Sequence, residues 1–212
     1  RRQRAGVDAA GEILHRQHLG TRQAAAAQRI AAAAGIELVA IDVRLPNPAR
    51  AWSILSSLAM AADHLERAEG RFDELTPVVR AGIEYSARIR PADVMRALNR
   101  RADLLAAIGA VFDQVDYLFT PTVATTAFVA GGPPPMTIAG VDTGGMGSVP
   151  FTAPFNISGQ PGVSIPCELS SEGLPIGVQV VGRRHDDLGV LACGAVAEQI
   201  MPWPHLAPMA SR

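Results

Sequence analysis

The segment from residue 151 to residue 182 contains two short stretches in which apolar and polar side chains alternate, at 163–165 and at 176–180. Successive side chains of a strand point to opposite faces, so this alternation predicts two strands. Between them, residues 170–173 (Ser-Ser-Glu-Gly) have the composition of a turn. We therefore expect two closely joined strands, preceded by a loop at residues 156–161.

The rest of the chain alternates between helical and strand patterns, which is typical of an α/β fold. Residues 1–20 are polar and basic with only weak helical spacing, and residues 123–150 predict a long loop rich in glycine and proline. From caps, prolines and apolar spacing we predict helices at 21–35, 47–70, 76–86 and 91–115, and from Asp186 or Asp187 to 200. Strands are predicted at 36–43 and 116–122.

The composition indicates which kind of protein and which partners to expect. A hydrophobic content of 48% and a net charge of −1 fit a soluble globular protein and favour neither nucleic acid nor a membrane surface as partner. Cys167 and Cys193 provide neither a disulfide framework nor a metal-ligand spacing, so we expect a reducing cytoplasm and no cofactor. His15 and His18 lie three residues apart, but no third ligand at a convincing spacing supports a metal site.

Lysine is missing from the sequence, because all 19 basic residues other than histidine are arginine. Arginine stays protonated in proteins, so it cannot replace a lysine that accepts a proton. Any catalytic mechanism that needs a lysine therefore cannot be completed by these 212 residues.

Two sets of residues resemble the amidase signature family. The first is N-I-S-G-Q-P at 156–161, I-P at 165–166 and G-L-P-I-G-V-Q at 173–179; the second is D-Y-L-F-T-P-T at 116–122. Several fixed residues in order make this resemblance specific. It covers most of residues 24–212 and leaves 1–23 as an unmatched N-terminal segment. The resemblance implies an α/β fold, the C-terminal part of the amidase signature fold, with a mixed β-sheet flanked by helices.

The family resemblance also implies how the chemistry is divided. Family members hydrolyse amide bonds with a serine, a second serine after a cis peptide bond, and a lysine, all from the N-terminal half. We therefore expect no catalytic residue in this chain. The residues that match the lining of the acyl pocket are Phe151, Thr152, Phe155, Asn156 and Thr122.

The expected function is thus the C-terminal, pocket-forming portion of an amide-bond hydrolase that lacks its Ser–cis-Ser–Lys half and is inactive alone. A small amide would be its partner only when the two halves are joined, and self-association stays open. The alternative is a non-catalytic binding or subunit-interaction module that reuses the amidase fold.

Other catalytic arrangements fit the sequence poorly. Ser148, in Gly-Gly-Met-Gly-Ser, superficially resembles the family's nucleophile loop, but that loop belongs far upstream and needs the missing lysine. No G-x-S-x-G elbow is present, and His185 is expected in a surface loop.

One position bears on the substrate. Glutamyl-tRNA amidotransferase A subunits, which belong to the same family, carry an Asp seven residues before the motif asparagine, where this chain has Val149. At the position of a matching Arg this chain has Val78, although Arg80 is close by. With Phe151 and Phe155 close by, we expect an apolar acyl or aryl amide as substrate instead of free glutamine.

Overall fold

The computed structural model describes residues 3–8, 19–41, 43–138, 140–142 and 149–203, and divides the chain into two compact units. The first unit comprises residues 1–44 and 108–212, and the second comprises residues 45–107. None of the described helices is long and apolar enough to cross a membrane.

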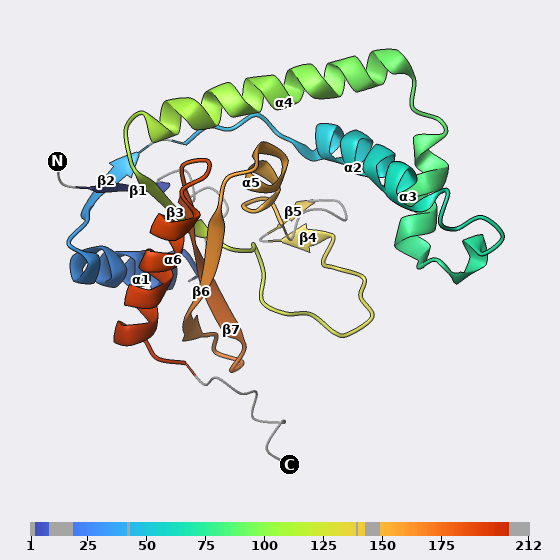
Figure 1. Cartoon of the computed structure of the whole chain (residues 1–212). Helices are drawn as coiled ribbons and strands as arrows, with labels where there is room; N and C mark the ends of the chain where they lie inside the picture. The colour runs from blue at the N-terminus through green and yellow to red at the C-terminus, as the bar shows by residue number, and fades with distance from the viewer. Residues whose placement is uncertain (1–2, 9–18, 42, 139, 143–148, 204–212) are drawn as a thin grey trace. The chain divides into compact units, whose positions relative to one another are not determined.

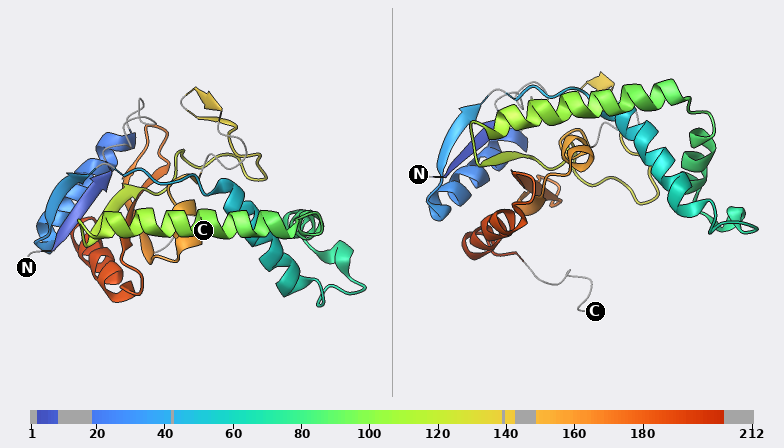
Figure 2. Two further views of the ribbon diagram at one scale, coloured as in Figure 1. Left: turned by 90° about the horizontal axis from the view of Figure 1, so that it is seen from above. Right: turned by 45° about the horizontal axis from the view of Figure 1, so that its top comes forward.

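The first unit contains a mixed five-stranded sheet in the order β2-β1-β3-β7-β6 (Figures 1 and 2). Strand β1 pairs in parallel with both β2 and β3, whereas β7 is antiparallel to β3 and to β6. The sheet therefore joins three parallel strands to one antiparallel hairpin. The strand bounds are β1 Arg4–Asp8, β2 Glu37–Ile41, β3 Tyr117–Pro121, β6 Gly162–Leu169 and β7 Pro175–Gly182.

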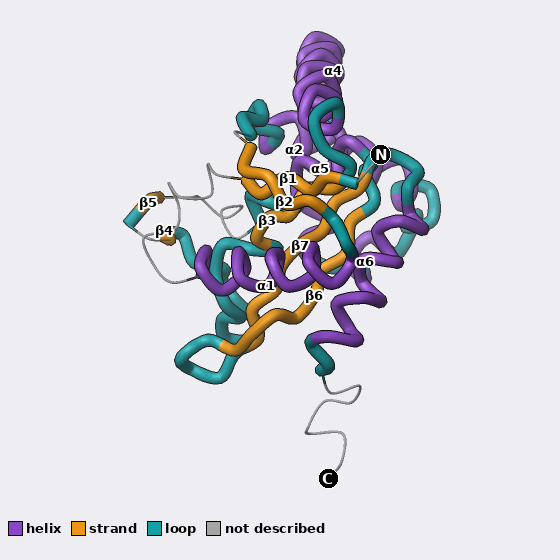
Figure 3. The backbone as a smooth tube through the Cα atoms, turned by 90° about the vertical axis from the view of Figure 1, so that its left-hand side faces the viewer, coloured by secondary structure: helices purple, strands orange, loops and turns teal. Residues whose placement is uncertain are grey.

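Helices α1 (Leu19–Ala34) and α6 (Asp187–Ile200) pack against each other and against the same face of the sheet (Figure 3). The core between them contains Phe119 of β3, Ile165 of β6, and Val178 and Val180 of β7. These side chains alternate along their strands with others that point to the opposite face. The fold class predicted from the sequence, α/β with a mixed sheet flanked by helices, is confirmed.

A short helix, α5, covers residues Ala153–Ser158, and the small strands β4 (Thr137–Ile138) and β5 (Val141–Asp142) form a hairpin. Two predictions are wrong here. Asn156, Ile157 and Ser158 belong to the helix and not to a loop, and Gly159 ends it with φ = 78°. The predicted loop at 123–150 contains the β4–β5 hairpin.

The second unit is helical. It contains α2 (Ala49–His64), a 3₁₀ turn, η2 (Phe72–Glu74), and α3 (Pro77–Ser86), and helix α4 (Pro91–Phe112) begins in it and ends in the first unit. Helix α3 has the predicted bounds apart from its cap, with Pro77 at its start. Helix α2 ends at His64, six residues before the predicted stop, because residues 65–70 form turns instead.

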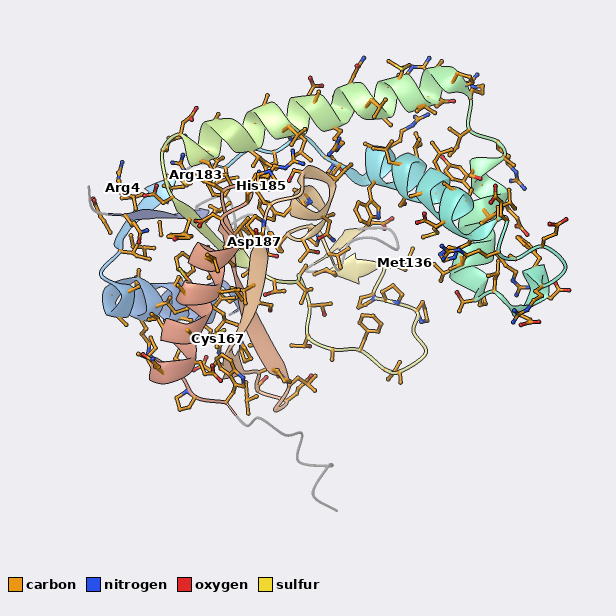
Figure 4. The ribbon with its side chains drawn as sticks, in the orientation of Figure 1. Arg4, Met136, Cys167, Arg183, His185 and Asp187 are labelled. Atoms are coloured by element: carbon orange, nitrogen blue, oxygen red, sulfur yellow. The ribbon has the colours of Figure 1, made fainter. Side chains whose placement is uncertain are left out.

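The weak helical spacing noted for the N-terminal segment is misleading at residues 4–8. These residues form strand β1, which lies between two other strands. The side chain of Asp116 fixes this position: its Oδ2 accepts a hydrogen bond of 2.9 Å from the backbone N–H of Arg4. Arg183, after β7, lies 3.4 Å from Asp116 Oδ1, and Figure 4 labels both arginines. The Asp of the D-x-L-x-x-P-T motif thus joins the ends of three strands.

Candidate functional site

The residues predicted to line a pocket lie on and before helix α5. Phe151 and Thr152 are half-buried and precede the helix, and Asn156 is exposed within it. Phe155 is only 5% exposed, so its side chain packs in the protein interior in this structure. Residues 151–156 are called the predicted pocket segment below. Thr122, also half-buried, lies directly after strand β3.

Gln179, the last residue of the G-L-P-x-G-x-Q motif, connects the predicted pocket segment to the sheet. Its buried side-chain amide donates one hydrogen bond to the backbone oxygen of Phe151 (3.0 Å) and one to Thr120 Oγ1 (2.9 Å). Thr120 in turn donates to the backbone oxygen of Pro121 at 3.0 Å. An amide nitrogen has two N–H groups, so both donors of Gln179 are used. The structure therefore explains the motif glutamine, which the sequence did not assign to the site.

Thr122 forms a second connection, to Ser164 of strand β6. The two hydroxyl oxygens lie 2.8 Å apart, although strand β7 separates β3 from β6 in the sheet. The contact is made above Gly177: a Cβ atom at this position would lie 2.8 Å from each of the two oxygens. A glycine in the middle strand therefore leaves room for the hydroxyls of its two neighbours to meet.

We expect Gly177→Ala to lower the free energy of unfolding by about 1 kcal/mol, because the added methyl group must break the Thr122–Ser164 hydrogen bond. Urea denaturation would measure the change. If the clash involves the serine hydroxyl, the same substitution costs less in a Ser164→Ala background, because the two sites are coupled. An equal cost in both backgrounds would contradict this explanation.

Of the remaining candidate side chains, the structure describes those of Ser158 and His185. Ser158 is fully buried and its hydroxyl contacts Gln160 Oε1 and the backbone oxygen of Phe155. His185 is exposed and has a positive φ of 70°. It lies in the turn before α6 (Figure 4). Ser148, His15 and His18 lie outside the described residues.

Both thiols are held in the protonated form at neutral pH. Burial raises the pKa of Cys193, on α6, to about 11. The same cause raises the pKa of Cys167, whose Sγ donates to the backbone oxygen of Ile176 at 3.3 Å. A thiol must lose its proton to act as a nucleophile or metal ligand, so neither group is poised for catalysis. In the part of the chain that the structure describes, no cluster of His, Cys, Asp or Glu is arranged to hold a metal.

Solved structures with the same fold include a bacterial aryl acylamidase of the amidase signature enzymes and a 6-aminohexanoate cyclic dimer hydrolase. The first superposes with a TM-score of 0.80 over 96% of this chain and 44% of its own length, at 22% identity. The second gives 0.73 over 99% of this chain and 47% of its own length, also at 22% identity. At this identity the likeness establishes the fold alone.

Curated relatives include the A subunits of glutamyl-tRNA(Gln) amidotransferase from two bacteria. The protein from Desulforapulum autotrophicum is 38% identical over 109 residues, which cover 50% of this chain and 21% of the relative. The one from Wolbachia sp. subsp. Drosophila simulans is 32% identical over 166 residues, 72% of this chain and 32% of the relative. The chain therefore spans a third or less of each of these relatives.

The sequence model of the family described as Amidase matches residues 20–191, which is most of the chain. Both motifs noted above, at 116–122 and at 156–179, lie within the matched residues. The match agrees with the mixed sheet and with the relatives, and on this basis the chain belongs to the Amidase family.

Proposed function

We propose that this chain forms part of the substrate-pocket wall of an amide-bond hydrolase and does not itself carry out the reaction. Family membership supports the reaction class. The observation that carries the second half of the proposal is the composition: the Ser–cis-Ser–Lys mechanism that the family resemblance implies needs a lysine, and these 212 residues contain none.

The arrangement of the described serines supports the same proposal. A serine becomes a nucleophile when a general base lies within hydrogen-bond reach of its hydroxyl. Ser158, the most buried of the described serines, bonds to backbone and amide oxygens, and Ser164 bonds to a threonine. In the described part of the chain no serine hydroxyl is hydrogen-bonded to a histidine. The proposed pocket wall thus offers hydroxyl groups that can form hydrogen bonds to a substrate, but no histidine that would activate them as nucleophiles.

For the substrate we propose a neutral acyl or aryl amide. Val149 stands where the glutamyl-tRNA amidotransferase A subunits carry an aspartate, and an ammonium group without a counter-charge is costly to bury. Phe155 does not contribute to an open surface here, because it is buried, so of the two phenylalanines Phe151 supplies the accessible apolar surface.

A serine-directed fluorophosphonate probe tests whether the chain is catalytic. We expect the purified 212-residue chain to remain unlabelled, because no described serine hydroxyl is hydrogen-bonded to a histidine. A serine hydrolase treated in parallel would show that the probe is active. Stoichiometric labelling of the chain would overturn the proposal, and loss of that labelling in Ser148→Ala would identify the nucleophile.

A further inference from the structure

Four polar side chains from three neighbouring strands or their ends lie together on the sheet face opposite α1 and α6. This polar patch consists of Thr120 and Thr122 at the end of β3, Ser164 on β6 and Gln179 on β7. Polar groups on a covered sheet face cost free energy unless they are paired. The patch therefore needs an account of which of its hydrogen-bonding groups are used.

Thr120 and Gln179, the inner half of the polar patch, use all their side-chain hydrogen-bond donors within the protein. Thr120 and Gln179 are buried, and both N–H groups of Gln179 and the O–H of Thr120 donate to protein oxygens. These bonds form a continuous chain from the backbone oxygen of Phe151 to the backbone oxygen of Pro121. Thr122, the next residue, is thus linked to the predicted pocket segment through Pro121, Thr120 and Gln179.

Thr122 and Ser164, the outer half of the polar patch, have one hydrogen-bond donor that is not used within the pair. Thr122 and Ser164 have two O–H groups between them, and their mutual hydrogen bond uses one. Ser164 is exposed and Thr122 is half-buried, so the second O–H faces accessible space. Gly177, which lies between the two residues in the sheet, has no side chain that would cover this hydroxyl group.

The absence of a charged hydrogen-bond partner among the described residues indicates which ligand atom fits the unused hydroxyl group. Among the described residues, Thr122 and Ser164 make side-chain hydrogen bonds only with each other, and no charged side chain is bonded to either. A carboxylate without a cationic partner is costly to desolvate, whereas a neutral ether, carbonyl or hydroxyl oxygen accepts one hydrogen bond at little cost. A neutral oxygen therefore fits the spare donor.

We propose that the hydroxyl pair Thr122–Ser164 is a specificity-determining subsite that binds a neutral hydrogen-bond acceptor in the acyl part of the amide substrate. This inference rests on the proposed function, because it places the pair in the pocket of an amide-bond hydrolase. It adds that the pocket is not purely apolar: Phe151 supplies apolar surface, and the hydroxyl pair supplies one donor.

Methoxyacetanilide and butyranilide test the subsite, because they differ only by an ether oxygen in place of a methylene group. The complete hydrolase, in which this segment is joined to its catalytic half, would be assayed by aniline release for kcat/KM on both. The intrinsic reactivities of the two anilides cancel when the ratio for a variant is compared with that of the wild type. We expect Thr122→Val and Ser164→Ala to reduce the preference for the ether by about 2- to 12-fold, the effect of one neutral hydrogen bond.

Two further variants control for structural damage. Thr122→Ser keeps the hydroxyl and is expected to retain the preference, and Ser171→Ala removes an exposed hydroxyl in the turn of the same hairpin and should leave it unchanged. If the wild type releases aniline but Thr122→Val and Ser164→Ala keep its preference, the subsite is refuted while the proposed function stands. If the wild type releases aniline from neither anilide, the proposed function itself fails, and the subsite with it.

Discussion

Phe119→Ala is expected to lower the free energy of unfolding by about 3–5 kcal/mol, the range for removing a large aromatic side chain from a core. Phe119 is 2% exposed and lies in β3, the strand that pairs with both β1 and β7. Its ring belongs to the core that also contains residues of α1 and α6. The substitution therefore leaves a cavity in the core between β3 and helix α1, which cannot collapse without moving one of them.

Equilibrium denaturation in urea, followed by circular dichroism, would measure this loss. A domain is stable by about 5–15 kcal/mol in total, so the variant would unfold at a much lower urea concentration. Phe128→Ala is the matched control, because Phe128 is 46% exposed and its loss should cost no more than about 0.5 kcal/mol. Equal midpoints for the two variants would show that Phe119 is not part of the core described above.

Gly6→Ala is expected to cost about 1–3 kcal/mol, the usual effect of overfilling a packed interior. A Cβ added to Gly6 would overlap the end of the Ile41 side chain and lie 3.3 Å from Val115 Cγ1. Ile41 and Val115 are both buried, so neither side chain has free space to move into. The prediction tests whether residues 4–8 really occupy the interior of the sheet.

Gly109→Ala provides the opposite control in the same experiment. A Cβ at Gly109, within α4, would meet no atom within 4 Å, and alanine favours a helix over glycine by about 0.5–1 kcal/mol. Thermal unfolding of the two variants should therefore shift in opposite directions. If Gly6→Ala leaves the unfolding temperature unchanged, β1 does not pack as the structure shows it.

Elements with strong local signals could be predicted from the sequence. The alternation at 163–165 and 176–180 correctly indicated the β6–β7 hairpin, and the Thr76-Pro77 pair indicated where α3 begins. Of the two predicted caps of α6, Asp186 and Asp187, the structure shows Asp186, whose side chain accepts from the backbone N–H of Gly189. In each case a few neighbouring residues determine the structure, without help from distant parts of the chain.

Elements that depend on distant contacts were not predictable in this way. Strand β1 is short and includes arginine, glycine and aspartate, and what makes it a strand is pairing with residues 37–41 and 117–119. The same is true of the site. Gln179 and Ser164 were visible as motif or strand residues, but their roles arise from Phe151 and Thr122, which are close only after folding.

The position of β1 inside the sheet, between β2 and β3, has a consequence for the order in which the protein can fold during its synthesis. The backbone of Arg4 is bound by a side chain 112 positions further along the chain, and β3 in turn needs β7. Strand β1 is therefore synthesised well before β3 and must wait, unpaired on the β3 side, while the second unit is made. An unpaired strand edge readily associates with other chains. The helical unit at 45–107 can form its local α2–α3 contacts meanwhile, so the edge of residues 4–8 that faces β3 stays unpaired until β3 has been made.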